Sequence, residues 1–241
     1  MKNLLFSAFA LFTITAFAQN QIRFEYEMIP YFDPGDKSMG MMNMVFLNSN
    51  YELIVEDNIS TFKFLDKIIN QQPQEGTISI QMGNRGTVFK NTTENIYLEE
   101  AALGPKNYLI QDSLTVFDWE ISKESKNILG FETRKATVTL DDKHKTKITA
   151  WYAPKLNFKT GPDKFWGLPG LILELNSGFE YENGGNEGFT YKALSVEVLQ
   201  ENVPVTKPDK GQKVSRQNYK KLTEEFSKKR KEMYSNGVDK D

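Results

Sequence analysis

Residues 22–28 read Ile-Arg-Phe-Glu-Tyr-Glu-Met, and this stretch sets the pattern for most of the chain. Apolar side chains occupy every second position and charged side chains lie between them. This alternation is typical of a strand with one buried and one exposed face. It recurs most clearly at residues 133–140 and 146–153, and strand signals extend from Gln21 to Leu199. The sequence therefore predicts a mainly β protein.

The supply of large side chains fits a broad sheet. The chain contains 17 Phe, 10 Tyr and 3 Trp, which together make up 12% of its residues. Aromatic side chains favour strands and fill wide interiors. Because no repeat or linker interrupts residues 19–241, we expect one domain there. We expect a broad, strongly curved antiparallel sheet, shaped like half of a barrel.

The C-terminal part changes character after Pro204 and Pro208. Ser215 is a suitable N-cap, so the sequence predicts a helix over about residues 215–234. Its apolar positions form a narrow stripe, consisting of Tyr219, Leu222, Phe226 and Met233. We expect this helix to pack on the sheet or its edge. A basic helix on a membrane surface is the alternative, although the stripe is thin for that role.

The N-terminus has the pattern of a secretory signal peptide. Lys2 precedes an apolar run over residues 4–17, and Ala16-Phe17-Ala18 matches a small-x-small cleavage site. A retained membrane anchor is the alternative, but the run is shorter than the roughly 20 residues that span a bilayer. We therefore expect a signal peptide at residues 1–18, cleavage near Ala18 and no membrane-spanning segment afterwards. The expected location is the periplasm or the medium.

Composition and charge narrow the possible partners. The formal net charge is −2 and there is no Cys, so a disulfide framework is excluded. Basic residues gather only near the C-terminus, where Glu residues interrupt them. A protein that binds nucleic acid needs clustered positive charge, so we do not expect a nucleic-acid partner.

Residues 161–175 form the most unusual stretch, and Gly167-Leu168-Pro169-Gly170-Leu171-Ile172 lies at its centre. Pro169 and Gly170 suit the two central positions of a type II turn. We therefore expect Leu168 to Leu171 to reverse the chain, with Leu171 and Leu173 facing away from Ile172 in the strand that follows. The stretch is either a packed turn that fixes sheet register or a loop that contacts a ligand.

In one-letter code residues 167–172 spell GLPGLI, and the chain resembles the GLPGLI family of exported proteins from Gram-negative Bacteroidetes. Residues 148–154, which include Trp151, and Phe165-Trp166 resemble the family in spacing, and residues 128–136 resemble its upstream element. The resemblance covers nearly all of the mature chain and implies an exported β domain. It implies no activity, because the family has none assigned. Thr133 stands where members often carry Cys, so a thiol role is not available.

The sequence offers little for catalysis. His144 is the one histidine, and it lies among Asp142, Lys143 and Lys145 in a predicted hairpin tip that we expect to be solvated. No Gly-x-Ser-x-Gly, His-Glu-x-x-His or phosphate-binding loop occurs. Carboxylate pairs can still perform acid-base chemistry, and the candidates near apolar strands are Asp112, Asp118, Glu120 and Glu174. We expect no catalytic residue and no cofactor, and leave enzymatic activity open.

A methionine cluster is the sharper candidate for a metal site. It consists of Met39, Met41, Met42 and Met44. Thioethers are soft ligands that suit Cu(I). Flexible core packing is the alternative.

We therefore expect an exported protein that binds an apolar ligand, a lipid or an extended peptide without catalysis, in support of the outer membrane. The ligand would lie in an open groove on the concave face of the sheet. The sequence does not identify the binding residues, and the nearest candidates are residues 167–172 with Trp151, Phe165 and Trp166. The alternatives are a Met-rich copper binder and a structural partner of a receptor or another outer-membrane protein.

Overall fold

A computed structural model describes residues 21–35, 44–67, 78–83, 85–201 and 203–235. The predicted signal peptide lies outside these residues. The strands are β1 (Ile22–Asp33), β2 (Met44–Leu47), β3 (Ser49–Glu56), β4 (Ile59–Leu65), β5 (Ile78–Gln81), β6 (Thr87–Asn91), β7 (Ile96–Leu103), β8 (Lys106–Asp112), β9 (Glu120–Ile128), β10 (Phe131–Thr139), β11 (Lys147–Ala153), β12 (Leu171–Glu180), β13 (Asn186–Val198) and β14 (Gln212–Val214). The helix is α1 (Arg216–Ser235).

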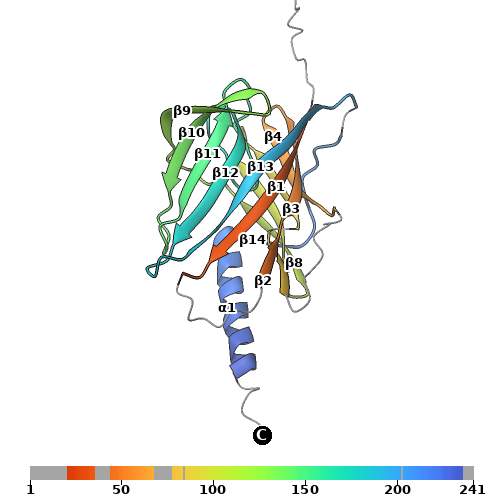
Figure 1. The fold of residues 1–241 in the computed structure, drawn as a ribbon. Coiled ribbons are helices and arrows are strands. Elements are labelled where there is room, and N and C mark those ends of the chain that lie inside the picture. Colours follow the sequence, from red (N-terminus) through yellow and green to blue (C-terminus); the bar gives the residue numbers. More distant parts are fainter. Residues whose placement is uncertain (1–20, 36–43, 68–77, 84, 202, 236–241) are drawn as a thin grey trace, which may run out of the picture.

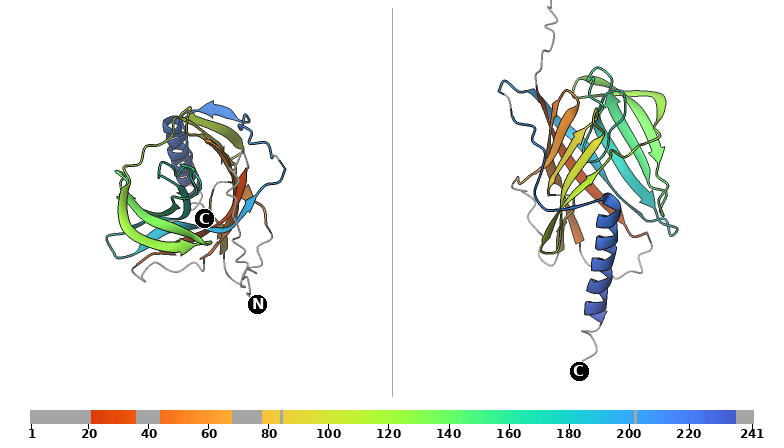
Figure 2. Two further views of the ribbon diagram at one scale, coloured as in Figure 1. Left: turned by 90° about the horizontal axis from the view of Figure 1, so that it is seen from above. Right: turned by 180° about the vertical axis from the view of Figure 1, so that it is seen from behind.

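Twelve of these strands form one sheet in the order β14-β8-β7-β6-β4-β3-β1-β13-β12-β11-β10-β9. Its neighbours are antiparallel, except that β14 pairs with β8 in parallel. Strands β2 and β5 form a separate two-stranded parallel sheet. Figure 2 shows the large sheet curling round on itself, with β9 and β14 as its free edges. The prediction of a mainly β chain with a broad, curved, open sheet is confirmed.

Strand β1 lies at the middle of the sheet, between β3 and β13 (Figure 1). The alternation in its sequence is confirmed, because its apolar side chains are buried on the concave face and the charged ones lie on the convex face. Those buried side chains are Ile22, Phe24, Tyr26 and Met28. Burying each large side chain stabilises the fold by about 1.5–3 kcal/mol.

Aromatic rings from neighbouring strands fill the concave face. The rings of Tyr51 and Phe62 stack with centroids 4.7 Å apart, and Tyr191 meets both edge-on at 5.7 and 5.5 Å. Such pairs add about 0.5–1.5 kcal/mol beyond burial. These rings are buried against one another, so they do not line the open groove that the aromatic content suggested.

Residues 154–170, which connect β11 to β12, also lie on the concave face. Phe165 and Leu168 belong to the same buried cluster as the β1 side chains. The hydroxyl groups of Thr160 and Ser60 are 3.0 Å apart in the interior. The Tyr26 hydroxyl donates to the Ile172 carbonyl at 2.6 Å, which joins the central strand to the start of β12. We call residues 154–170 the inner segment.

The turn that ends the inner segment differs from the prediction. Gly170 N donates to Leu168 O at 2.8 Å, which closes a γ-turn on Pro169. A type II turn would bring Leu171 N to Leu168 O, but Leu171 N donates to Leu156 O at 3.0 Å instead. Leu171, Ile172 and Leu173 are all fully buried, so both faces of β12 are covered at its start. The register between β11 and β12 is irregular between Trp151 and Tyr152.

Helix α1 begins where Ser215 was predicted to cap it. The Ser215 hydroxyl accepts from Asn218 N at 3.2 Å, and the Asp112 carboxylate accepts from Arg216 N at 3.1 Å. The helix touches β8 near its start and then projects away from the sheet (Figures 1 and 2). Residues 224–233 are all exposed, although the Phe226 ring lies close to Gly104 in the turn between β7 and β8. Among the described residues, no helix has the length and apolar character needed to cross a membrane.

We predict that Gly170→Ala destabilises the protein far more than Gly184→Ala. Both glycines have a positive φ, 154° and 83°. A Cβ at Gly170 would lie 2.3 Å from the Ala153 carbonyl oxygen, whereas one at Gly184 would meet nothing within 4 Å. We expect Gly170→Ala to lower the free energy of unfolding by about 3 kcal/mol and Gly184→Ala by about 1 kcal/mol, measured by urea denaturation. Equal losses would contradict this account of the turn.

Candidate functional site

Lys90 holds the inner segment against the sheet. It lies on β6, shares the concave face with Val88, and its side chain is 0% exposed. Its Nζ donates to the carbonyl oxygens of Gly161 at 2.6 Å and Phe165 at 3.2 Å, and also to that of Asp163. An ammonium group has three N–H donors, so these three carbonyl groups satisfy it fully.

Burying the charged ammonium group of Lys90 costs free energy, because the group loses its hydration. Burial lowers the pKa of Lys90 to about 7, and the negative charge of Asp163 opposes that shift. An unpaired buried charge costs far more than a paired one. The contacts to residues 161–165 therefore fix the path of the inner segment.

Trp151 and Trp166, the two tryptophans named above as candidates for ligand binding, both contact other parts of the fold. Trp119 Nε1 donates to Trp166 O at 2.9 Å, and Trp166 Nε1 donates to Thr115 O at 2.6 Å. Trp151 is half-buried, with the Lys126 ammonium 4.4 Å from its ring centroid. Of residues 167–172, Gly167 and Pro169 are exposed and the other four are buried. These contacts favour a packed turn over a ligand loop.

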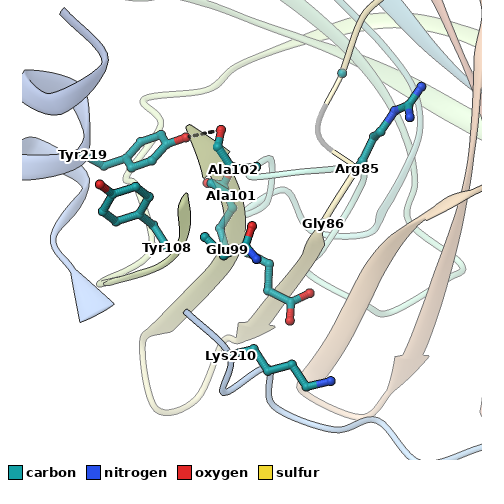
Figure 3. A pocket seen from close by; sticks show the side chains of 11 residues that line it. Arg85, Gly86, Glu99, Ala101, Ala102, Tyr108, Lys210 and Tyr219 are labelled. Carbon is teal, nitrogen blue, oxygen red and sulfur yellow. Dashed lines mark hydrogen bonds between the residues drawn. The ribbon is translucent and has the colours of Figure 1, made fainter. Parts of the chain in front are cut away.

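A pocket of about 610 Å³ opens where the connection between β5 and β6, strands β7 and β8, and helix α1 meet. Residues that line it include Arg85, Glu99, Ala101, Tyr108, Lys210 and Tyr219. Figure 3 shows tyrosines from β8 and α1 together at one side of this pocket, with Lys210 at another. We call it the end pocket.

The tyrosine wall of the end pocket is held in place by packing and one hydrogen bond. The rings of Tyr108 and Tyr219 meet edge-on with centroids 5.6 Å apart. The Tyr219 hydroxyl donates to the Ala102 carbonyl at 3.2 Å, which Figure 3 marks. The pocket thus has a fixed apolar side, and the helix forms part of it.

The rest of the end pocket carries charge of both signs, and Figure 3 shows Arg85 and Lys210 at different sides of it. Arg85 and Lys210 are cationic, and the Glu99 carboxylate accepts a hydrogen bond from the Tyr97 hydroxyl at 2.7 Å. Burial, reinforced by the charge of Asp163, raises the pKa of Glu99. Perturbed carboxyl groups in clefts are frequent at functional sites. Sequence reasoning missed Lys90 and Glu99, although each occupies an inward position of an alternating strand.

The four carboxylates proposed from the sequence do not form a catalytic pair, and each has a different environment. Asp112 caps α1 and lies 3.8 Å from the Arg216 guanidinium, whereas Glu174 pairs with Lys126 at 2.8 Å. Asp118 and Glu120 are exposed. His144 is exposed in the hairpin tip, where its ring stacks on Phe179 at 4.3 Å.

The methionine cluster is only partly described. Met39, Met41 and Met42 lie outside the described residues, and Met44 is 42% exposed on β2. Within the described ranges, no group of three or more His, Asp or Glu side chains could hold a metal ion. The copper site stays a prediction.

Comparison with known proteins gives two findings. The model of a family described as "Protein of unknown function (Porph_ging)" matches residues 141–174, a stretch that contains β11 and the inner segment. None of the curated proteins compared with the chain matches it.

Two solved structures of PNGF-II, in space groups C2 and P21, resemble the fold at TM-scores of 0.54 and 0.55. Each is 16% identical to this chain and covers 86% of it. The chain covers 33% and 34% of the PNGF-II chains, so it spans about a third of their length. At this identity the likeness shows the fold alone.

We predict that Lys90→Met destabilises the protein by roughly 3–5 kcal/mol, because it leaves three buried carbonyl groups without a donor. Lys63→Met is the matched control, since Lys63 is exposed on the adjacent strand β4. We expect the control to change stability by less than about 0.5 kcal/mol. Chemical denaturation measures both, and a similar small effect in the two variants would contradict the proposed role of Lys90.

We also predict that stability rises with pH between 7 and 9. The Lys90 amine has a pKa of about 7 in the folded state and near 10.5 in the unfolded chain. Between these values the unfolded state binds more protons, so raising the pH favours folding by up to about 1.4 kcal/mol per unit. Lys90→Met should lack this slope. Parallel curves for the two proteins would show that another group is responsible.

Proposed function

We propose that the chain is an exported, non-catalytic binding protein that holds a small amphiphilic ligand in the end pocket. The main support for this proposal is the end pocket, which has a volume of about 610 Å³ and is lined by tyrosines and by charged side chains. Binding sites for small molecules commonly have volumes of about 300–1,000 Å³ and a few placed polar groups.

The lining indicates how such a ligand would lie. Its apolar body would pack on Tyr108, Tyr219 and Ala101, and an acidic head group would lie near Lys210. The raised pKa of Glu99 makes its carboxyl easier to protonate. A protonated carboxyl does not repel an acidic head group and can donate a hydrogen bond to it.

The end pocket suits a smaller ligand than the lipid or extended peptide that the composition suggested. A long lipid or an extended peptide would need an open groove along the concave face. The inner segment and the stacked rings of Tyr51, Phe62 and Tyr191 occupy that face. A compact ligand at the end of the sheet is compatible with this packing.

Export and family membership form part of the same proposal. Export is supported by the signal-peptide pattern of residues 1–18, and the location proposed for the mature chain, residues 19–241, is the periplasm or the medium. Membership of the GLPGLI family is supported by residues 167–172 and by the match of residues 141–174 to a family of unknown function. We also propose that an outer-membrane protein is a partner of the exported chain.

The first experiment is an intact mass spectrum of the protein, purified without denaturation from the organism that makes it. We expect two species, the bare mature chain and the chain with a ligand of a few hundred daltons. Release of that ligand by organic solvent would identify it. The bare chain alone would count against a stably bound ligand.

We predict that laurate, used as a probe, binds saturably and that Ala101→Trp weakens this binding at least about tenfold, since steric exclusion of well-packed atoms readily exceeds about 1.4 kcal/mol. Ala101 pairs with Tyr108 and lines the pocket, so the larger side chain enters it, and circular dichroism checks that the variant is folded. Ser125→Trp, on the exposed edge strand β9, is the control and should bind like the wild type. Calorimetric titration compares the three proteins. Equal affinity in all three would place the probe elsewhere and overturn the assignment of the pocket.

A further inference from the structure

Strand β13 continues beyond the point where its pairing with β12 stops. The pairing with β12 ends at Lys192, whereas the pairing with β1 continues to Val198. A β-bulge accompanies this change, because a register shift leaves Leu194 without a partner on β1. Among the strands that the structure describes, β1 alone pairs with residues 195–198. We call residues 195–198 the β13 extension.

The start of β12 bonds to other parts of the fold and does not pair with the β13 extension. Ile172 N donates to Thr160 O of the inner segment at 3.1 Å. The Ile172 carbonyl accepts from the Tyr26 hydroxyl of β1 at 2.6 Å. Both backbone groups of Ile172 are therefore satisfied without β13. The edge of the β13 extension that lies away from β1 is consequently not paired with β12.

Two residues of the β13 extension direct backbone groups to this unpaired edge. Leu199 N donates to Gln21 O at 2.9 Å, so the backbone groups of Leu199 point towards β1. The direction alternates from one residue to the next along an antiparallel strand. The N–H and C=O groups of Glu197 therefore point to β1, and those of Val196 and Val198 point to the unpaired edge. An unpaired edge of this kind is a template for another strand.

The β13 extension is accessible from solvent. Val196 is 37% exposed, and Ser195 and Glu197 are exposed as well. Proteins commonly block exposed strand edges with Lys or Pro, but residues 194–198 contain neither. The edge is therefore open to a further strand.

The side chains of the β13 extension indicate which strand would pair with it. Val196 and Val198 lie on one face of the strand and Glu197 on the other. The Arg23 guanidinium lies 2.8 Å from the Glu52 carboxylate and 3.3 Å from the Glu197 carboxylate, so two carboxylates share one cation. Because side chains directly opposite each other interact, an added strand favours apolar residues opposite the valines and a basic residue opposite Glu197.

We propose that the β13 extension is a peptide-binding edge, which takes a short extended peptide with alternating apolar and basic residues as an added strand. Main-chain hydrogen bonds to Val196 and Val198 would provide the affinity, and the alternate side chains the selectivity. The pairing of Lys192 with β12 ends the space for an added strand. A short peptide can end there, whereas in a second copy the chain continues past Val198 through Leu199.

This site is independent of the end pocket, because no residue of the β13 extension lines that pocket. The probe is a fluorescent peptide of the sequence Lys-Val-Lys-Val-Lys with both ends capped, and anisotropy measures its binding. We expect saturable binding with a dissociation constant below about 1 mM. The same peptide with every backbone nitrogen methylated keeps the charge and the side chains but cannot donate main-chain hydrogen bonds. We expect it to bind at least about tenfold more weakly.

Variants of the protein then separate the backbone from the charge. Val196→Pro removes the N–H that points to the unpaired edge and leaves the ladder with β1 intact, so the probe should bind at least about tenfold more weakly. Val196→Thr keeps that N–H and a β-branched side chain and should bind within about threefold of the wild type. Glu197→Gln should weaken binding about threefold or more, whereas Glu182→Gln, exposed between β12 and β13, should leave it unchanged.

The proposal is overturned if the probe does not bind, if the methylated peptide binds equally well, or if Val196→Pro binds like the wild type. Sedimentation of the wild-type protein tests the other occupant. A dimer that Val196→Pro abolishes would assign the edge to a second copy and overturn the peptide. If circular dichroism shows that Val196→Pro is unfolded, the methylated peptide and Glu197→Gln provide the test.

Discussion

The ammonium group of Lys90 lies in the interior, and the fold has to supply polar partners for it. The carbonyl groups of Gly161, Asp163 and Phe165 do so, which draws the inner segment onto the concave face. Once that segment is in place, Phe165 and Leu168 complete the core that β1 begins. A single charged side chain on β6 therefore determines how the interior of the sheet is filled.

Filling the interior moves binding to the periphery. In a curved sheet with an empty concave face, a ligand would lie among the rings of Tyr51, Phe62 and Tyr191. Here those rings contact one another. The end pocket lies elsewhere, between the end of the sheet and α1. The hydrogen bond from the Tyr219 hydroxyl to the Ala102 carbonyl holds its tyrosine wall in place.

The sequence predicted the elements better than their interior contacts. Alternation in residues 22–28 and the cap at Ser215 are local signals, and the structure confirms both. The prediction of a type II turn at Pro169 was wrong because Leu171 N donates its hydrogen bond to the carbonyl of Leu156. Leu156 is distant in sequence, so this contact could not be read from the local pattern. Lys90 and Glu99 carried a readable signal, an ionisable residue at an inward position, and Tyr97, the partner of Glu99, lies two residues away on the same strand. The partners of Lys90 on the inner segment follow only from the fold.

The position of β1 has a consequence for when the protein can fold. This strand is among the first parts of the chain to be synthesised, yet it pairs along its whole length with β13, from Ile22 with Val198 to Asp33 with Asn186. Closing so long a loop is slow, and contacts between distant residues delay folding. The centre of the sheet thus stays incomplete until nearly the entire chain has emerged. For a protein that we propose to be exported, this delay keeps the chain threadable through a narrow translocation channel until β13 has passed.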